Sequence, residues 1–185
     1  MPSSALAANS LDTLEVSVEV SLALKSIVIS SILSAGMVSM VKNGTFSSND
    51  AALAVVEMPQ WPSFSAKADS WTLVLDNIND PGNLGTIIRI ADWYGIKHIV
   101  CSPDTADCYN PKVIAAAKGS FLRVQLHYQA LQPLLANSSL PVYGAYLGGE
   151  SVHHLKLIQS GGFIVLGNEA NGISAELEDT ISRKI

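Results

Sequence analysis

Positive charge is scarce in this sequence, which has 11 lysines and arginines against 16 aspartates and glutamates. The formal net charge at pH 7 is therefore −5. A domain that binds nucleic acid along a broad surface carries a clear excess of basic residues. The composition thus excludes a broad basic footprint, although a few cations gathered at one cleft still permit local contact with RNA.

Cysteine is also scarce, and the two cysteines, Cys101 and Cys108, lack the spacing of a metal or redox motif. We interpret both as free thiols in a reducing compartment, which favours a cytoplasmic protein. Other metal ligands are no better grouped. His153 and His154 are adjacent on a predicted helix and point in different directions, and no acidic or cysteine partner has suitable spacing. We therefore expect no metal site.

Long apolar runs are missing too. The most apolar stretch, residues 27–41, contains four serines and a glycine and falls short of the about 18 apolar residues that a membrane span needs. It lies too far from the N-terminus, with too few basic residues before it, for a secretory signal. We expect no membrane partner.

At 185 residues, the chain has room for one substantial core and a small second unit. Residues 1–58 contain a predicted helix, Ser21–Ala35, and two predicted strands, Met37–Val41 and Ala52–Met58, which are too few for a stable domain alone. Residues 59–70 combine two prolines and three serines without a regular period, which is typical of a linker. The main domain is therefore predicted over residues 71–185.

Strands and helices alternate in this main domain. The predicted strands are short apolar runs, most of them continuous, as in strands that are buried on both faces: Thr72–Asp76, Ile99–Cys101, Val142–Leu147 and Phe163–Leu166. Between and after them come the predicted helices Leu84–Tyr94, Pro111–Lys118, Leu131–Ala136 and Ser151–Ile158. This order predicts an α/β fold with a parallel sheet and ligands at its carboxyl edge.

The most informative loop is Asn77–Asp92, which follows the apolar run Leu73–Leu75 and opens into a helical pattern. It contains the turn dipeptide Pro81-Gly82, and its glycines let a ligand or another segment approach the backbone closely. Arg89 lies off the apolar stripe of the helix. Because helical side chains lean toward the N-terminus, its guanidinium should lie back over the loop, where a cation indicates phosphate binding.

Two segments carry a resemblance to a known family. Residues 80–89, Asp-Pro-Gly-Asn-Leu-Gly-Thr-Ile-Ile-Arg, resemble the first signature of the SpoU/TrmH family, RNA ribose 2′-O-methyltransferases of the knotted SPOUT class. Residues 166–174, Leu-Gly-Asn-Glu-Ala-Asn-Gly-Ile-Ser, resemble its second signature. The resemblance covers residues 71–185 well and 26–58 more loosely. It implies an α/β-knot fold, a partial substrate-binding domain over residues 1–58, S-adenosylmethionine as cofactor, rRNA or tRNA as substrate, and a homodimer.

The resemblance also implies catalytic roles for Arg89, Asn83 and Glu169. In the family the arginine, helped by an RNA phosphate, is the proposed acceptor of the ribose proton. Because arginine stays protonated in water, orienting the ribose and stabilising the alkoxide are simpler roles for Arg89. Asn83 would hold ribose or phosphate, and Glu169 would orient Arg89.

For the cofactor, the resemblance implies contacts from Gly167 and Asn168 in the second signature and from Leu147 and Gly148 after the preceding strand. Backbone groups of these residues would read the adenine. The loops 77–85, 148–150 and 167–172 all leave carboxyl ends of predicted strands, so they are expected to line one pocket.

Simpler explanations exist for several of these residues. Gly148-Gly149 would serve equally well as a tight turn. Arg89 has an alternative partner in Asp92, three residues further along the helix, although such a surface pair contributes only a few tenths of a kcal/mol. Glu169 would also be accommodated as a solvated loop acid.

The chain departs from the family in two places. Many relatives have an arginine where Ala115 stands, and the third signature, Ser-Leu-Asn on a final helix, is not found before Ile185. Asn9-Ser10-Leu11 echoes it only faintly. The alternative hypothesis is therefore a catalytically incompetent fragment that retains partial cofactor or RNA binding, and we expect this chain alone to bind cofactor weakly, to be poorly soluble and to turn over little. An unrelated dinucleotide-binding module is disfavoured, because Gly82-Asn83-Leu84-Gly85 lacks the Gly-x-Gly-x-x-Gly spacing.

Overall fold

The computed structural model describes residues 38–41, 53–56, 61–154 and 160–185. By contacts, the chain divides into two units, residues 1–60 and 61–185. The first contains β1 (Val38–Val41) and β2 (Leu53–Val56), which pair antiparallel with Val38 opposite Val56. Both predicted strands of this unit are confirmed, whereas the predicted helix Ser21–Ala35 lies outside the described residues.

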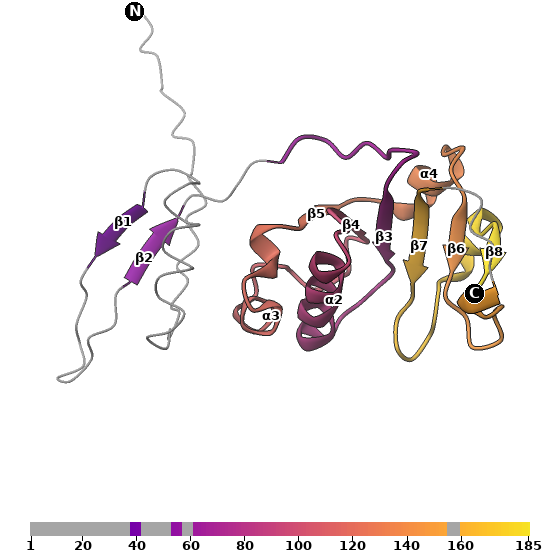
Figure 1. The fold of residues 1–185 in the computed structure, drawn as a ribbon. Coiled ribbons are helices and arrows are strands. Elements are labelled where there is room, and N and C mark those ends of the chain that lie inside the picture. Colours follow the sequence, from indigo (N-terminus) through magenta and orange to yellow (C-terminus); the bar gives the residue numbers. More distant parts are fainter. Residues whose placement is uncertain (1–37, 42–52, 57–60, 155–159) are drawn as a thin grey trace, which may run out of the picture. The chain divides into compact units, whose positions relative to one another are not determined.

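The second unit is built on a six-stranded parallel sheet with the strand order β5-β4-β3-β7-β6-β8 (Figure 1). Its strands are β3 (Trp71–Leu75), β4 (His98–Cys101), β5 (Gln125–Tyr128), β6 (Val142–Gly144), β7 (Gly162–Leu166) and β8 (Arg183–Lys184). The predicted parallel α/β sheet is therefore confirmed. The sequence did not indicate β5, because it is short and rich in polar residues; β5 and β8 each pair with only one neighbour, at an end of the sheet.

The helices of this unit are α2 (Pro81–Trp93), α3 (Pro111–Ala117) and α4 (Leu131–Ala136). Three short 3-10 helices, η1 (Ser120–Leu122), η2 (Val152–His154) and η3 (Ala175–Thr180), complete it. Of the helix predicted over residues 151–158, only η2 lies within the described residues, and it is a single 3-10 turn. None of the helices described in the structure is long and apolar enough to cross a membrane.

Alternate residues of β3 point into two separate cores. Leu73 and Leu75 pack with Ile88 under α2 and α3, on the side of the sheet that faces the viewer in Figure 1. Val74 packs with Leu131 of α4 and with η3 on the opposite side. Burial on both faces explains the continuous apolar run of this strand.

Residues just before β3 extend the second core. The side chain of Phe64 packs against this core, and its ring lies 5.7 Å from that of His98 and 5.2 Å from that of His127. The Nδ1 atom of His98 lies 3.3 Å from Nε2 of His127. Burial, and then the charge of Lys67, lowers the pKa of His98; burial, and then the charge of His98, lowers the pKa of His127.

The close approach of α2 to α3 depends on Gly85. A Cβ atom at this position would lie 2.5 Å from the Cβ of Ala116 and 2.9 Å from the carbonyl oxygen of Val113. The segment that approaches the backbone of Gly85 is therefore α3, and a backbone carbonyl has little freedom to move away.

We expect Gly85→Ala to lower the free energy of unfolding by about 1–3 kcal/mol, the usual cost of overpacking a close contact. The matched control is Gly148→Ala, because nothing lies within 4 Å of a Cβ placed at Gly148. Urea unfolding of both variants measures the effect. An equal loss in the two variants would contradict this account of Gly85.

The histidine pair gives a pH dependence with a defined sign. Because both pKa values are lowered in the folded state, the unfolded chain binds more protons as the pH falls past the ordinary value of 6.5. The stabilisation is complete above that pH and is lost progressively below it. We therefore expect the free energy of unfolding to fall between about pH 7 and pH 5. A His127→Asn variant, followed by urea unfolding at several pH values, should show a shallower slope than the wild type.

Candidate functional site

Two loops meet at the carboxyl edge of the sheet, one after β3 and one after β7. The strands are parallel neighbours in register, with Leu75 opposite Leu166, so their following loops emerge side by side. Asn168 Nδ2 donates a hydrogen bond to the carbonyl oxygen of Asn77 at 2.8 Å. The backbone N–H of Ser174 donates to Oδ2 of Asp76 at 2.7 Å. The loops after β3 and β7 thus form one hydrogen-bonded unit.

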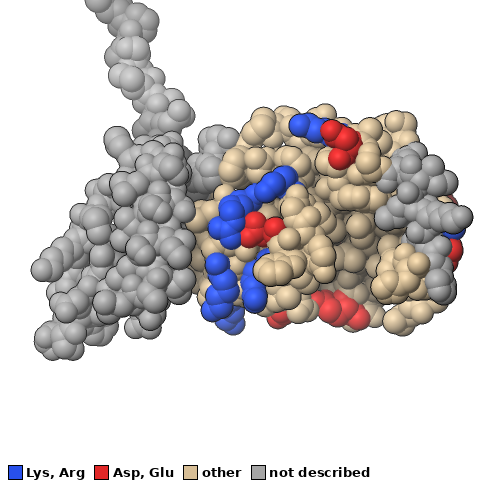
Figure 2. Space-filling view, viewed as in Figure 1, with Lys and Arg blue, Asp and Glu red and all other residues tan. Residues whose placement is uncertain are grey.

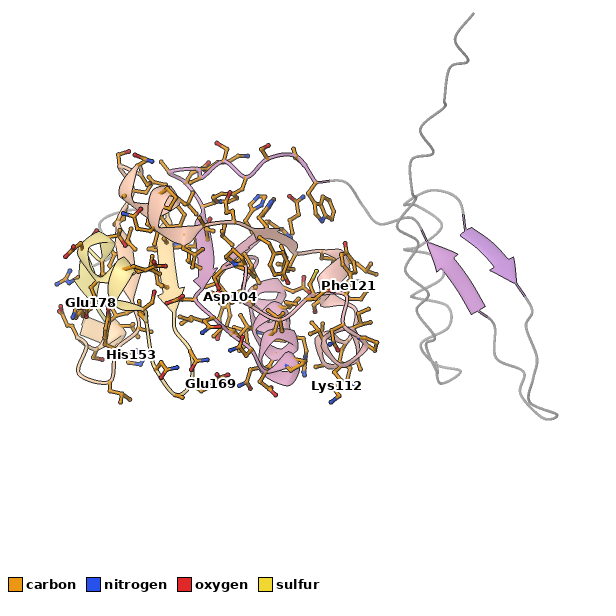
Figure 3. All side chains as sticks on the ribbon, turned by 180° about the vertical axis from the view of Figure 1, so that it is seen from behind. Asp104, Lys112, Phe121, His153, Glu169 and Glu178 are labelled. Atoms are coloured by element: carbon orange, nitrogen blue, oxygen red, sulfur yellow. The ribbon has the colours of Figure 1, made fainter. Side chains whose placement is uncertain are left out.

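The beginning of α2 places Asn83 in this unit. Asp80 caps the helix by accepting the backbone N–H of Asn83 at 2.7 Å, and Pro81 occupies the first turn, where its missing N–H costs nothing. The side-chain amide of Asn83 then donates to Oε1 of Glu169. Figure 3 shows Glu169 on the loop that follows β7. Two of the three predicted catalytic residues are therefore in direct contact, and the partner of Glu169 is Asn83 rather than Arg89.

Arg89 lies further along α2 with an exposed side chain. It makes no ion pair or hydrogen bond with the described residues. Its alternative partner, Asp92, instead binds Arg123, with 2.6 Å between Asp92 Oδ2 and Arg123 Nη2. The hydrogen bonds from Arg123 lower the pKa of Asp92. The pairing of Arg89 with Asp92 is thus excluded as the explanation of Arg89.

Asn168 organises the loop after β7. Its Oδ1 accepts the backbone N–H groups of Ala170 at 2.9 Å and Asn171 at 3.2 Å, while its Nδ2 binds Asn77 as described above. Its backbone pairs with that of Gly172, which has a φ of +70°. A Cβ at Gly167 would lie 2.1 Å from the carbonyl carbon of Gly172, so this crossing of the loop needs glycine at 167. The polar atoms of the Asn168 side chain are therefore engaged within the protein.

Leu147 and Gly148 follow β6, on the other side of β7. The side chain of Leu147 is fully exposed, and a Cβ at Gly148 would have no neighbour within 4 Å. The loop is held against β8 by hydrogen bonds from Tyr146 N to Ile185 O at 2.8 Å and from Glu150 N to Lys184 O at 3.0 Å. Their cofactor contacts, like those of Gly167 and Asn168, remain predictions.

A cavity of about 390 Å³ opens beside the joined loops. Its lining comes from the end of β3, the loop after β4, the start of α4 and the loop after β7: Asp76, Asn77, Ser102, Pro103, Asp104, Ala130, Leu131, Gln132, Pro133, Asn168, Asn171, Gly172, Ser174 and Glu176. The loop at Gly148 does not contribute. The sequence analysis missed the walls after β4 and at α4; the available signal was the polar run Ser102-Pro103-Asp104 directly after a buried strand.

Acidic and amide groups dominate the polar lining of the cavity. Asp76 is 6% exposed at its floor, and Asn77 beside it has a φ of +59°. No lysine or arginine of the described residues lines it. Within the described ranges, no group of three or more histidine, cysteine, aspartate or glutamate side chains is arranged to hold a metal ion.

Comparison with known proteins gives a consistent match. The model of the SpoU rRNA Methylase family matches residues 70–185. The 23S rRNA (guanosine(2553)-2′-O)-methyltransferase RlmP of Bacillus subtilis is 34% identical over 128 residues, which cover 67% of this chain and 50% of RlmP. The chain thus spans about half the length of this relative and less of several others.

Solved structures agree with this match. A putative RNA methyltransferase of the TrmH family from Porphyromonas gingivalis is 35% identical, with a TM-score of 0.64, and the match covers 76% of this chain and 58% of that one. AviRb from Streptomyces viridochromogenes in complex with AdoMet has the same TM-score at 24% identity, over 72% of this chain and 55% of AviRb, and supports the fold alone.

The contacts of Asn168 predict a test of the loop junction. Asn168→Asp keeps the acceptor for Ala170 and Asn171 but removes the donor to Asn77, so we expect the free energy of unfolding to fall by about 1–2 kcal/mol. Asn79→Asp, an exposed position in the first loop, introduces the same charge and is the control. Urea unfolding compares them, and an Asn168→Asp variant as stable as the control would show that the junction contributes nothing.

Proposed function

The chain belongs to the SpoU rRNA methylase family, and on this premise we propose that the protein is an S-adenosylmethionine-dependent RNA 2′-O-ribose methyltransferase that acts on rRNA or tRNA. The observation that carries the proposal is the junction of the two signature loops, in which Asn83 of the first binds Glu169 of the second. Residues 70–185, which the family model matches, contain both loops. The names of the similar proteins support an RNA substrate.

The reaction needs a ribose 2′ hydroxyl in line with the methyl group, so that the new O–C bond forms as the S–C bond breaks. The neutral thioether leaves, and the hydroxyl proton passes to water. Positioning supplies much of the rate of such a transfer. Asn83, whose side chain Glu169 holds at the helix entrance, is placed to orient the ribose or its phosphate. Arg89 brings an exposed positive charge on the same helix, which suits an RNA phosphate and the developing alkoxide.

The cofactor supplies an activated methyl group on a positively charged sulfur. The exposure of Leu147 and Gly148 is suited to binding this cofactor. The leucine is fully exposed and offers an apolar surface to adenine, and the backbone at Gly148 is open to a ligand. Gly167 and Asn168 directly follow the neighbouring strand β7, at the same edge of the sheet. These four residues are our proposal for cofactor binding.

Local positive charge supports contact with RNA. Figure 2 shows Lys and Arg side chains gathered on one part of the second unit, over the region of α3 and η1 in Figure 1. The described cations on or directly after these elements are Lys112, Lys118 and Arg123. Among the described residues these cations form a local group, which is compatible with the local contact expected from composition.

We also propose a homodimer. Ile90, Trp93 and Tyr94 are exposed at the end of α2, with Trp93 at 85% and Tyr94 at 75%. Because Trp93 and Tyr94 follow Ile90 by three and four residues, the three side chains lie on one side of the helix. An exposed apolar patch of this kind is typical of a protein–protein interface. Sedimentation equilibrium measures the assembly, and a monomer at all concentrations would exclude it.

We propose residues 1–58 as an accessory substrate-binding domain, 59–70 as a linker and 71–185 as the methyltransferase domain, which the division into two contact units supports. A cytoplasmic location is supported by Cys101 and Cys108, which are both buried free thiols.

We expect Arg89→Ala to abolish methyl transfer to RNA while the affinity for S-adenosylmethionine stays within a few-fold. The physical reason is that the exposed charge of Arg89 acts on the acceptor side rather than around adenine. Methylation assays and calorimetry measure the two quantities, and Lys67→Ala, which removes an exposed cation of the predicted linker, is the control. Wild-type turnover of Arg89→Ala would refute the catalytic role, and a parallel loss of cofactor affinity would make the residue structural.

A further inference from the structure

The cavity beside the joined loops lies where the chain changes direction across the sheet. From β3 the chain runs outward to β4 and β5 on one side, and then returns to β6 and β7 on the other. In open parallel sheets, this divergence leaves a crevice at the carboxyl edge in which ligands bind. The cofactor residues proposed above lie further along the sheet, after β6 and β7, and only Asn168 of these also lines the cavity.

Asp76 gives the cavity an accessible acceptor. The residue is 6% exposed, and its Oδ2 accepts the backbone N–H of Ser174. Its other carboxylate oxygen accepts no hydrogen bond from the described residues, and the residue lines the cavity. This oxygen is not among the fully buried side-chain atoms without a partner, so it is accessible. An accessible carboxylate oxygen in the lining can accept an N–H or O–H group of a ligand.

The walls narrow the choice of ligand further. Pro103, Leu131 and Pro133 contribute apolar side chains, while Asp104 and Glu176 are exposed acids of the lining. Figure 3 shows Asp104 and Glu169 beyond the same edge of the sheet. No described lysine or arginine takes part, so a phosphate or carboxylate would meet only negative charge. A flat, uncharged ring system with N–H groups on its edge fits both the apolar walls and the acceptor.

We propose that this cavity binds a nucleobase of the RNA substrate, with guanine preferred; the proposal rests on the function proposed above. Its volume of about 390 Å³ lies within the range of small-ligand sites. The N1–H and N2–H groups of guanine lie side by side and donate toward a single carboxylate group. Uracil places carbonyl oxygens beside its one ring N–H, and the amino groups of adenine and cytosine stand next to a ring nitrogen that accepts.

The position of the cavity fits a base whose backbone runs through the methylation site. Asn168 lines the cavity, and the next residue, Glu169, binds Asn83, where we place ribose or phosphate. A base in the cavity would then leave its phosphates outside the acidic rim. Enzymes that act on nucleic acids commonly read an extruded base through hydrogen bonds to its Watson–Crick edge.

The test is a titration of the 185-residue chain with guanosine, adenosine, cytidine and uridine in the absence of cofactor. Binding is followed through the NMR chemical shifts of the backbone amides. Nucleosides without phosphate exclude binding through the cations of α3. We expect guanosine to shift the amides of Asp76, Asn77 and Ser174, with a dissociation constant at least about tenfold below that of uridine. Equal affinity for the four nucleosides, or shifts confined to other parts of the protein, would overturn the proposal.

Two variants locate the binding. Asp76→Asn keeps an acceptor for Ser174 N–H but turns an amide donor toward the cavity, so it should remove the preference for guanosine. Gln132→Trp, at an exposed position of the lining, should weaken guanosine binding about tenfold or more by narrowing the cavity, whereas Ala136→Trp, exposed on the same helix but outside the lining, should leave it unchanged. Unchanged guanosine affinity in Gln132→Trp would contradict the assignment even if Asp76→Asn failed to fold.

Failure of this proposal and failure of the proposed methyltransferase function give different results. Guanosine binding at the cavity without any S-adenosylmethionine binding would reject the methyltransferase function and keep the base site. Cofactor binding and methylation without nucleoside binding at the cavity would keep the methyltransferase function and reject the base site.

Discussion

The hydrogen bonds between the loops after β3 and β7 are the constraint on which the candidate site depends. Asp76 and Asn77 directly follow β3, and Ser174 and Asn168 belong to the loop after its neighbour β7. Each loop also anchors itself in a core, through Ile78 in one and Ile173 in the other, and these hydrogen bonds tie the two together. The same junction brings Asn83 to Glu169 and shapes the floor of the cavity.

This junction requires a rigid support, which the central strand β3 provides. Its side chains are buried on both faces, by α2 and α3 on one and by α4 and η3 on the other. Gly85 allows α2 to approach α3 closely, and this fixes the helix whose first turn carries Asn83. Packing around a glycine thus determines where a polar side chain lies, and a site built on rigid elements keeps its geometry.

Charge is divided between different parts of the second unit. The cavity lining includes Asp76, Asp104 and Glu176, whereas described cations occur on and after α3 and at Arg89 on α2. A chain with a net negative charge can therefore present a local positive surface and still surround the cavity with acidic groups. The positive surface and the acidic cavity belong to separate segments. At physiological ionic strength, screening by salt means that a charge substitution in one of them changes the electrostatic potential at the other very little.

The sequence by itself determined the class of fold and the location of the two signature loops. The continuous apolar runs at residues 72–76 and 163–166 indicated buried parallel strands, and Asp80-Pro81 marked the beginning of α2, because these signals are local and come from burial and capping. Only the tertiary structure decided which distant groups pair. Asp92 binds Arg123 rather than Arg89, Glu169 binds Asn83, and the loop after β4 closes the cavity with α4. A polar strand such as β5 could not be predicted from the sequence either. Such a strand forms only where a neighbouring strand offers unpaired backbone N–H and C=O groups. Whether it does so depends on which remote segments of the chain the fold brings together.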